Sequence, residues 1–226
     1  MKYNAFMNRV RLCIFDMDGL LIDSERIYLE SAMECSRIHN YGVSDELIRR
    51  TMGNNMAETK RRFLETMGED FPFEKFRDDR LVIQDEYLRN HPIEKKKGTE
   101  ELLDYLDEKK ILKAVATSTR RVRANQFLES AGLNGRFDHI VYGDDLIESK
   151  PRPEIYLRAI SAFDVDKSEI LAFEDSGNGI LSAVNAGIKV VLVPDLAYVA
   201  DEVKEKSFTV LNDLTEAVKL IDEINR

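Results

Sequence analysis

The chain has 226 residues, of which 43% are hydrophobic and 33% are charged, and its formal net charge is −9 at pH 7. This balance is typical of a globular protein and excludes a disordered chain. The negative charge disfavours nucleic acid and anionic membrane surfaces as partners. The longest run without a charged residue, 176–188, is too short to span a bilayer, and the first 15 residues contain no long apolar run.

The cysteines and histidines give no sign of a disulfide framework or a metal cluster. Cys13 and Cys35 lack the paired spacing that such sites show in sequence. The three histidines are too scattered to suggest a shared role: His39, His91 and His139. A reducing compartment is the simplest one for such a chain. We therefore expect a monomeric cytoplasmic protein that binds neither nucleic acid nor a membrane.

Short apolar runs alternate with helical patterns over most of the chain. The runs predict strands at residues 10–15, 112–117, 139–142, 170–173 and 189–193. Most of them are nearly continuous in apolar residues, as expected for parallel strands that are buried on both faces. Helical patterns lie at 99–108, 122–131, 153–163 and 177–186. This alternation predicts an α/β fold with a doubly wound, Rossmann-like parallel sheet.

Residues 25–90 interrupt the alternation, because no strand pattern occurs there. Apolar residues recur on three helical faces: Leu29, Ala32 and Met33; Met56, Phe63 and Met67; Phe76, Ile83 and Tyr87. We expect an all-helical cap domain at 25–90, inserted into a core made of residues 1–24 and 91–226. A domain that is joined to the core at two crossings can act as a lid over the end of the first strand.

Two acidic residues follow the first predicted strand. In an open α/β sheet, ligands bind beyond the carboxyl ends of the strands, which is where Asp16 and Asp18 lie. Gly19 allows a sharp turn after them. An Asp-x-Asp-Gly run alone fits an acidic turn as well as it fits a catalytic site.

Polar residues follow three more of the predicted strands. Thr117 and Ser118 come after the second, although such a pair more often caps a helix. Lys150 lies in a loop stiffened by proline, whereas a single lysine is usually a solvated surface charge. Glu174 and Asp175 end the fourth strand, and two carboxylates at a strand end are costly without a cation.

Together these groups predict one site for phosphoryl transfer. The Asp16 and Asp175 carboxylates suit Mg²⁺, which reduces the repulsion between an anionic nucleophile and a phosphoryl group. Asp16 can then attack phosphorus, and Asp18 can protonate the leaving oxygen and later deprotonate water. Three groups would hold the equatorial oxygens: Thr117, the Ser118 backbone and Lys150.

These segments resemble the motifs of haloacid-dehalogenase-superfamily phosphatases that carry a helical cap after the first strand. The layout is similar to that of β-phosphoglucomutase and its phosphatase relatives, and the matching segments are 15–25, 116–118, 149–153 and 173–179. The resemblance implies that Asp16 is the nucleophile and Asp18 the acid and base, with Thr117 and Lys150 on phosphate. It also implies a Mg²⁺ ion on the following groups: the Asp16 carboxylate, the Asp18 carbonyl and the Asp175 carboxylate. Glu174 is either a ligand or, as we favour, a base that holds a metal-bound water.

The expected function is hydrolysis of a small phosphomonoester, such as a sugar or polyol phosphate. Transfer of the β-phosphoglucomutase type is the alternative. The mutases carry a histidine where this chain has Tyr28, and their basic cap loop corresponds to residues 52–56, which hold no charge. A dehalogenase would leave Asp18 and the acidic pair without a role, and a receiver-like module has these groups in the reverse order.

Some basic residues of the cap and hinge could also contact an anion. Lys60, Arg61 and Arg62 are the candidates for a second anionic contact, although a helical run of this kind commonly faces solvent. The run 95–97 fits a solvated charge cluster beside the hinge better than a binding site.

Overall fold

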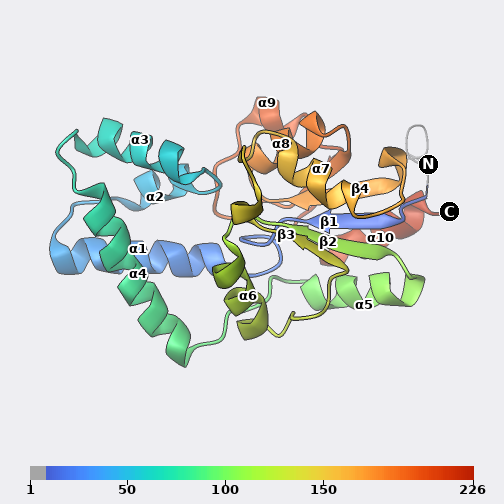
Figure 1. Cartoon of the computed structure of the whole chain (residues 1–226), viewed down its shortest axis with the longest axis horizontal. Helices are drawn as coiled ribbons and strands as arrows, with labels where there is room; N and C mark the ends of the chain where they lie inside the picture. The colour runs from blue at the N-terminus through green and yellow to red at the C-terminus, as the bar shows by residue number, and fades with distance from the viewer. Residues whose placement is uncertain (1–8) are drawn as a thin grey trace.

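The computed structural model describes residues 9–226 and shows a parallel sheet with a group of helices to one side (Figure 1). The sheet has six strands in the order β3-β2-β1-β4-β5-β6. Their bounds are β1 Leu12–Phe15, β2 Leu112–Ala116, β3 His139–Val141, β4 Ile170–Glu174, β5 Lys189–Leu192 and β6 Thr209–Val210. Phe15 pairs with Val115 on one side and Phe173 on the other, so the ends of the three central strands are level.

Helices cover both faces of this sheet. The core helices are α5 Thr99–Lys109, α6 Arg121–Ser130, α7 Glu154–Ser161, α8 Gly177–Asn185, α9 Asp201–Lys204 and α10 Thr215–Ile224. Alternate residues of β1 belong to different apolar clusters. Phe15 lies in the cluster that contains Leu103 of α5, and Ile14 lies in the cluster that contains Ile155 of α7. The doubly wound sheet predicted from the sequence is confirmed.

The helical insertion after the first strand is confirmed too. It contains α1 Ser24–His39, α2 Asp45–Thr51, α3 Met56–Met67 and α4 Phe73–Asn90, followed by α5 before β2 (Figure 1). Their buried faces form a separate apolar cluster that includes Ile48, Phe63 and Phe76, with Ala197 of the core packed against it. The domain limits at 24/25 and 90/91 stay a prediction.

Two chain segments connect the insertion to the sheet, and they lie side by side. The Asp23 amide donates to the Glu94 carbonyl at 2.9 Å, and the Lys96 amide donates to the Leu21 carbonyl at 2.9 Å. The Thr99 hydroxyl donates to the same Leu21 carbonyl at 3.0 Å. Because hydrogen bonds join the two connecting segments, the hinge is a single hydrogen-bonded unit rather than two independent linkers.

The predicted strands and helices of the core end within two residues of the observed ones. Thr117 follows β2 rather than ending it, although its amide still donates to the Val141 carbonyl at 3.1 Å. Met56 and Tyr87, expected on buried faces, are 55% and 39% exposed because they lie in terminal turns of α3 and α4. The sequence did not predict β6, α9 or α10. Among residues 9–226, no helix has the length and apolar character needed to cross a membrane.

Candidate active site

The carboxyl ends of β1 and β4 bring three acidic side chains together. Asp16 follows β1 and is 7% exposed, while Glu174 and Asp175 at the end of β4 are 0% and 2% exposed. The three residues offer carboxylate oxygens that all lie within 4.8 Å of one another. Because β1 and β4 are paired neighbours, this proximity follows directly from the sheet register.

Lys150 reaches this acidic group from the loop before α7. Its ammonium nitrogen lies 2.5 Å from Asp16 Oδ1 and 2.6 Å from Glu174 Oε1. Burial alone would lower the pKa of Lys150, but the charges of Asp16 and Glu174 raise it above its ordinary value. The lysine is therefore a buried, ion-paired positive charge beside the end of the first strand and not a surface cation.

Glu174 is also held in place by two hydroxyl groups and by the first turn of α8. Its Oε1 also accepts from the Tyr156 hydroxyl at 2.6 Å, and its Oε2 accepts from the Ser176 hydroxyl at 3.3 Å. A Cβ on Gly179 would lie 1.9 Å from Oε2, so α8 packs directly on this carboxylate. Glu174 thus orients Lys150, and Tyr156 is a contributor that the sequence did not reveal.

Asp18 lies in a cradle of hydroxyl groups. Its Oδ1 accepts from Ser24 at 2.6 Å, and its Oδ2 accepts from Thr119 at 2.8 Å and Thr117 at 3.2 Å. Burial and the charge of Asp16 raise the pKa of Asp18, whereas the hydroxyl hydrogen bonds act against the rise. A raised pKa favours a carboxyl group that carries a proton, which is the form a general acid needs.

The remaining predicted residues differ in their surroundings. Thr117 is completely buried, and its hydroxyl oxygen also accepts from the Thr119 amide at 3.0 Å. Ser118 is exposed, and its carbonyl packs so closely on Gly143 that a Cβ there would lie 2.0 Å away. The part of Ser118 that packs closely in the structure is therefore its backbone, and its role in phosphate binding stays a prediction.

Two further carboxylates, Glu25 and Asp195, extend the acidic region. In the described part of the chain, three buried carboxylate oxygens have no hydrogen-bond partner: Glu25 Oε2, Asp175 Oδ2 and Asp195 Oδ2. A Cβ on Gly19 would lie 2.5 Å from Asp175 Oδ2 and 3.3 Å from Asp195 Oδ2, so both acids converge on this turn. Burial and then the charge of Glu25 raise the pKa of Asp175 well above its usual range.

These unpartnered oxygens fit a cation. Hard carboxylate oxygens are the ligands that Mg²⁺ prefers, and uncompensated buried charge is costly without one. The residues of this structure are therefore compatible with the metal that the sequence predicted. Asp175 is the best-placed ligand because its free oxygen and Asp16 belong to the same cluster.

Lys96 partly balances this negative charge from the hinge. Its ammonium nitrogen lies 2.6 Å from Asp195 and 3.3 Å from Asp23. The expectation that residues 95–97 form only a solvated cluster is wrong for Lys96, whose side chain is 23% exposed. Lys97 fits the expectation, since its side chain is 75% exposed.

The loop between α2 and α3 crosses from the helical insertion to the core beside the site. Asn55 donates to the Ser149 hydroxyl at 2.9 Å, and Asn178 donates to the Gly53 carbonyl at 3.0 Å. A Cβ on Gly53 would lie 2.7 Å from the Ser176 side chain. The insertion therefore closes on the two core segments that precede α7 and α8.

The cap run of basic residues does not take part in the site. Lys60 pairs with Glu74 at 2.5 Å, Arg62 pairs with Glu58 at 2.9 Å, and Arg61 also pairs with Glu58. These are exposed ion pairs on α3 and its neighbour. The structure therefore supports the alternative in which Lys60, Arg61 and Arg62 face solvent.

A different cap arginine is buried. Arg80 of α4 is 7% exposed, its guanidinium lies 4.4 Å from the ring centre of Tyr28, and it donates to Gln84 at 2.8 Å. No ion pair is found for Arg80 among residues 9–226. Tyr28 follows Glu25 by three positions on α1, so the two share a face of that helix. The sequence pattern gave no signal for Arg80, which is one of many charged residues in α4.

Comparison with known proteins assigns the class. The family model described as haloacid dehalogenase-like hydrolase matches residues 13–193, so the chain belongs to this family. It is a phosphoric monoester hydrolase of the β-phosphoglucomutase and phosphatase-like branch.

Two relatives and one solved structure illustrate the similarity. The chain is 32% identical over 180 residues to a phosphorylated carbohydrates phosphatase of Thermotoga maritima, covering 78% of this chain and 81% of the relative. It is 33% identical over 198 residues to (DL)-glycerol-3-phosphatase 2 of Arabidopsis thaliana, covering 80% and 78%. The solved β-phosphoglucomutase of Clostridium difficile superposes with a TM-score of 0.77 over 96% of this chain and 97% of that one. At 20% identity, this last likeness concerns the fold alone.

Proposed function

We propose that the protein is a Mg²⁺-dependent phosphatase that hydrolyses a small sugar or polyol phosphate through a phosphorylated Asp16. The observation that carries this proposal is the convergence of Asp16, Asp18, Lys150 and Asp175 at one edge of the sheet. The two relatives above are named as phosphatases of phosphorylated carbohydrates and of glycerol 3-phosphate, which supports the substrate class. The cytoplasmic compartment and the monomeric state remain predictions.

The metal would be held by the Asp16 and Asp175 carboxylates and by the Asp18 carbonyl. When bound, it supplies positive charge that lowers the repulsion between the nucleophile and the phosphoryl group. The unpartnered Asp175 oxygen supports this ligand set. Glu174 is satisfied by Lys150 and Tyr156, which favours a supporting role over direct ligation.

The side chains of this protein divide the chemistry between them. A carboxylate oxygen of Asp16 attacks phosphorus and forms an aspartyl phosphate while the bond to the leaving oxygen breaks. Asp18 gives its proton to that oxygen, then takes a proton from the water that attacks the intermediate. Lys150 and Thr117 stabilise the charge on the equatorial oxygens. The second attack releases inorganic phosphate and restores Asp16.

Hydrolysis is favoured over transfer to a second sugar oxygen. Tyr28 stands where the mutases carry a histidine, and the Arg80 guanidinium lies over the face of its ring. The loop at 52–56 is uncharged and is engaged with the core through Gly53 and Asn55. Neither element offers the basic contacts that would orient a bound sugar phosphate as the acceptor. Transfer of the β-phosphoglucomutase type is the alternative function.

Arg80 is the proposed substrate contact in the insertion. Burial lowers its pKa from the ordinary value, yet an arginine remains charged. A buried cation that lacks a carboxylate partner is costly, so a polar or anionic part of the substrate would relieve that cost. Arg80 lies over Tyr28, and Tyr28 shares a face of α1 with Glu25, one of the acids of the catalytic region.

A substrate screen tests the proposal. Purified protein with Mg²⁺ is offered sugar phosphates, polyol phosphates, nucleotides and phosphoglycolate, and free phosphate is measured. Release from a sugar or polyol phosphate, lost on removal of Mg²⁺ with a chelator, is the expected result. Conversion of β-glucose 1-phosphate to glucose 6-phosphate with little free phosphate would favour the mutase, and inactivity on every ester would refute both functions.

A further inference from the structure

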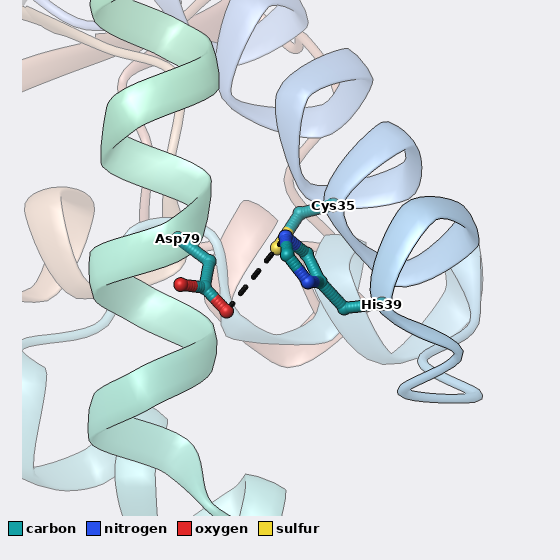
Figure 2. A group of neighbouring side chains, drawn as sticks. All are labelled: Cys35, His39 and Asp79. Atoms are coloured by element: carbon teal, nitrogen blue, oxygen red, sulfur yellow. Dashed lines mark ion pairs between the residues drawn. The ribbon is translucent and has the colours of Figure 1, made fainter.

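A second cluster of potential metal ligands lies in the helical insertion. Cys35 and His39 are four residues apart on α1, and Asp79 faces them from α4 (Figure 2). The three side chains offer a sulfur, a ring nitrogen and a carboxylate oxygen that all lie within 4.8 Å of one another. Residues four apart share a helix face, so α1 presents two ligands in the same direction.

This cluster is separate from the catalytic edge of the sheet. Ser24, which bonds to Asp18, is the first residue of α1, and His39 is the last. At about 1.5 Å of rise per residue, the two ends of α1 are roughly 22 Å apart. The charges that act on Asp79 are local too, coming from Lys75 and His39. A ligand in this cluster would therefore be distinct from the metal of the proposed phosphatase.

We propose that Cys35, His39 and Asp79 form a binding site for a zinc-like divalent cation, with water as the fourth ligand. The distance from His39 Nε2 to Asp79 Oδ2 is 3.8 Å. Zinc lies about 2.0–2.2 Å from nitrogen and oxygen ligands, so in a tetrahedral site this nitrogen and this oxygen would need to approach each other by only a few tenths of an ångström. Thiolate and imidazole ligands favour zinc over Mg²⁺.

The burial of the ligands fits such a site. Cys35 is completely buried, whereas His39 is exposed at the surface and gives an ion a route of entry. The Cys35 thiol makes only a long contact of 3.7 Å with the Phe76 carbonyl, so little is lost when the sulfur binds a metal. On binding, the thiol proton leaves to solvent as the sulfur–metal bond forms.

The Lys75 ammonium group competes with a metal ion for the Asp79 carboxylate. Its ammonium nitrogen lies 2.7 Å from Asp79 Oδ2, the same oxygen that accepts from the Tyr41 hydroxyl at 2.6 Å. The Lys75 side chain is 64% exposed and can leave Asp79 without opening the insertion. The site therefore predicts opposite effects for two neighbouring changes: loss of His39 weakens binding, and loss of the Lys75 charge strengthens it.

Cobalt binding tests the proposal independently of catalysis. The full-length protein is first saturated with Mg²⁺ and then titrated with Co²⁺, while the near-ultraviolet thiolate-to-cobalt charge-transfer band is recorded. The acidic site at the sheet edge has no sulfur, and Cys13 is buried in the sheet core, so this band reports on Cys35. We expect one equivalent of Co²⁺ to produce the band and Zn²⁺ to abolish it.

Three variants complete the test. Cys35→Ser should remove the band, His39→Gln should weaken Co²⁺ binding about tenfold or more, and Lys75→Gln should strengthen it. Since His39 and Lys75 are exposed, their variants remain informative if Cys35→Ser fails to fold. Absence of the band in the folded wild-type protein would overturn the proposal. So would a band that persists in folded Cys35→Ser, or Co²⁺ affinity unchanged by His39→Gln.

Discussion

The Lys150 ammonium nitrogen lies 2.5 Å from Asp16 Oδ1, although 134 positions separate the two residues in sequence. Both side chains are almost completely buried, so neither charge is well screened by water. The contact occupies one carboxylate oxygen of the proposed nucleophile and leaves the second for the phosphoryl group or a metal. Removal of the Lys150 ammonium would leave Asp16 as an uncompensated buried charge, whereas loss of the Asp16 carboxylate would leave Lys150 paired with Glu174 alone.

Asp16→Asn should reduce phosphate release at least about a thousandfold, because an amide cannot form the proposed intermediate. The side chain has the same shape and can still accept from Lys150, so the fold should be retained. Phosphate release and circular dichroism measure the two effects. Retained activity in the folded variant contradicts the role of Asp16.

Gly179→Ala and Gly177→Ala form a matched pair in the first turn of α8. A Cβ at 179 would lie within 2.2 Å of three atoms of the Glu174 carboxyl group, whereas a Cβ at 177 has its nearest contact at 3.7 Å. Gly179→Ala should cost about 1–3 kcal/mol by overpacking and should lower activity by displacing Glu174 from Lys150.

Thermal unfolding and phosphate release are compared for both glycine variants. Gly177→Ala should keep the wild-type activity and stability within about 1 kcal/mol. Equal effects of the two substitutions would show that the packing of α8 on Glu174 is not what matters.

Lys96→Met should destabilise the protein by about 1–3 kcal/mol, since it leaves Asp195 buried without a donor. The same change at Lys97, whose side chain is 75% exposed in its ion pair with Asp213, should change stability much less because water screens the pair. The free energy of unfolding in urea distinguishes them. If the two variants unfold alike, the bridge from Lys96 to Asp195 does not stabilise the hinge.

Arg80→Gln should raise KM for the best substrate about tenfold and change kcat less, if Arg80 holds a distant part of the substrate. Arg77→Gln is the control, because Arg77 lies on the same helix and pairs with Asp78 at the surface. Steady-state kinetics measure both. A fall in kcat at constant KM would assign Arg80 to something other than substrate binding.

The parts of the fold and site that could be predicted share one property: they follow from a local pattern. Strand ends locate Asp16, Glu174 and Asp175, and the parallel sheet then brings them together. No local sequence pattern indicates the order of the strands within the sheet. The two-residue strand β6 is also too short to show an alternating pattern.

Other residues are recognisable only in three dimensions. The sequence assigned no role to Glu25 or Asp195, and the structure buries a carboxylate oxygen of each without a hydrogen-bond partner. Lys96 lies in a run of three lysines, and only its contact with Asp195 separates it from its neighbours. Tyr156 belongs to an amphipathic helix, where an aromatic residue fits a core position as well as a contact with Glu174.

The most direct test of the central claim is to trap the phosphorylated enzyme. The protein is mixed with Mg²⁺ and a phosphorus-labelled substrate from the screen, quenched in acid during turnover, and digested for mass spectrometry. The mechanism predicts hydroxylamine-labile label on the peptide that contains Asp16, and no label on Asp16→Asn. Label on any other residue, or turnover during which the protein carries none, would contradict the account.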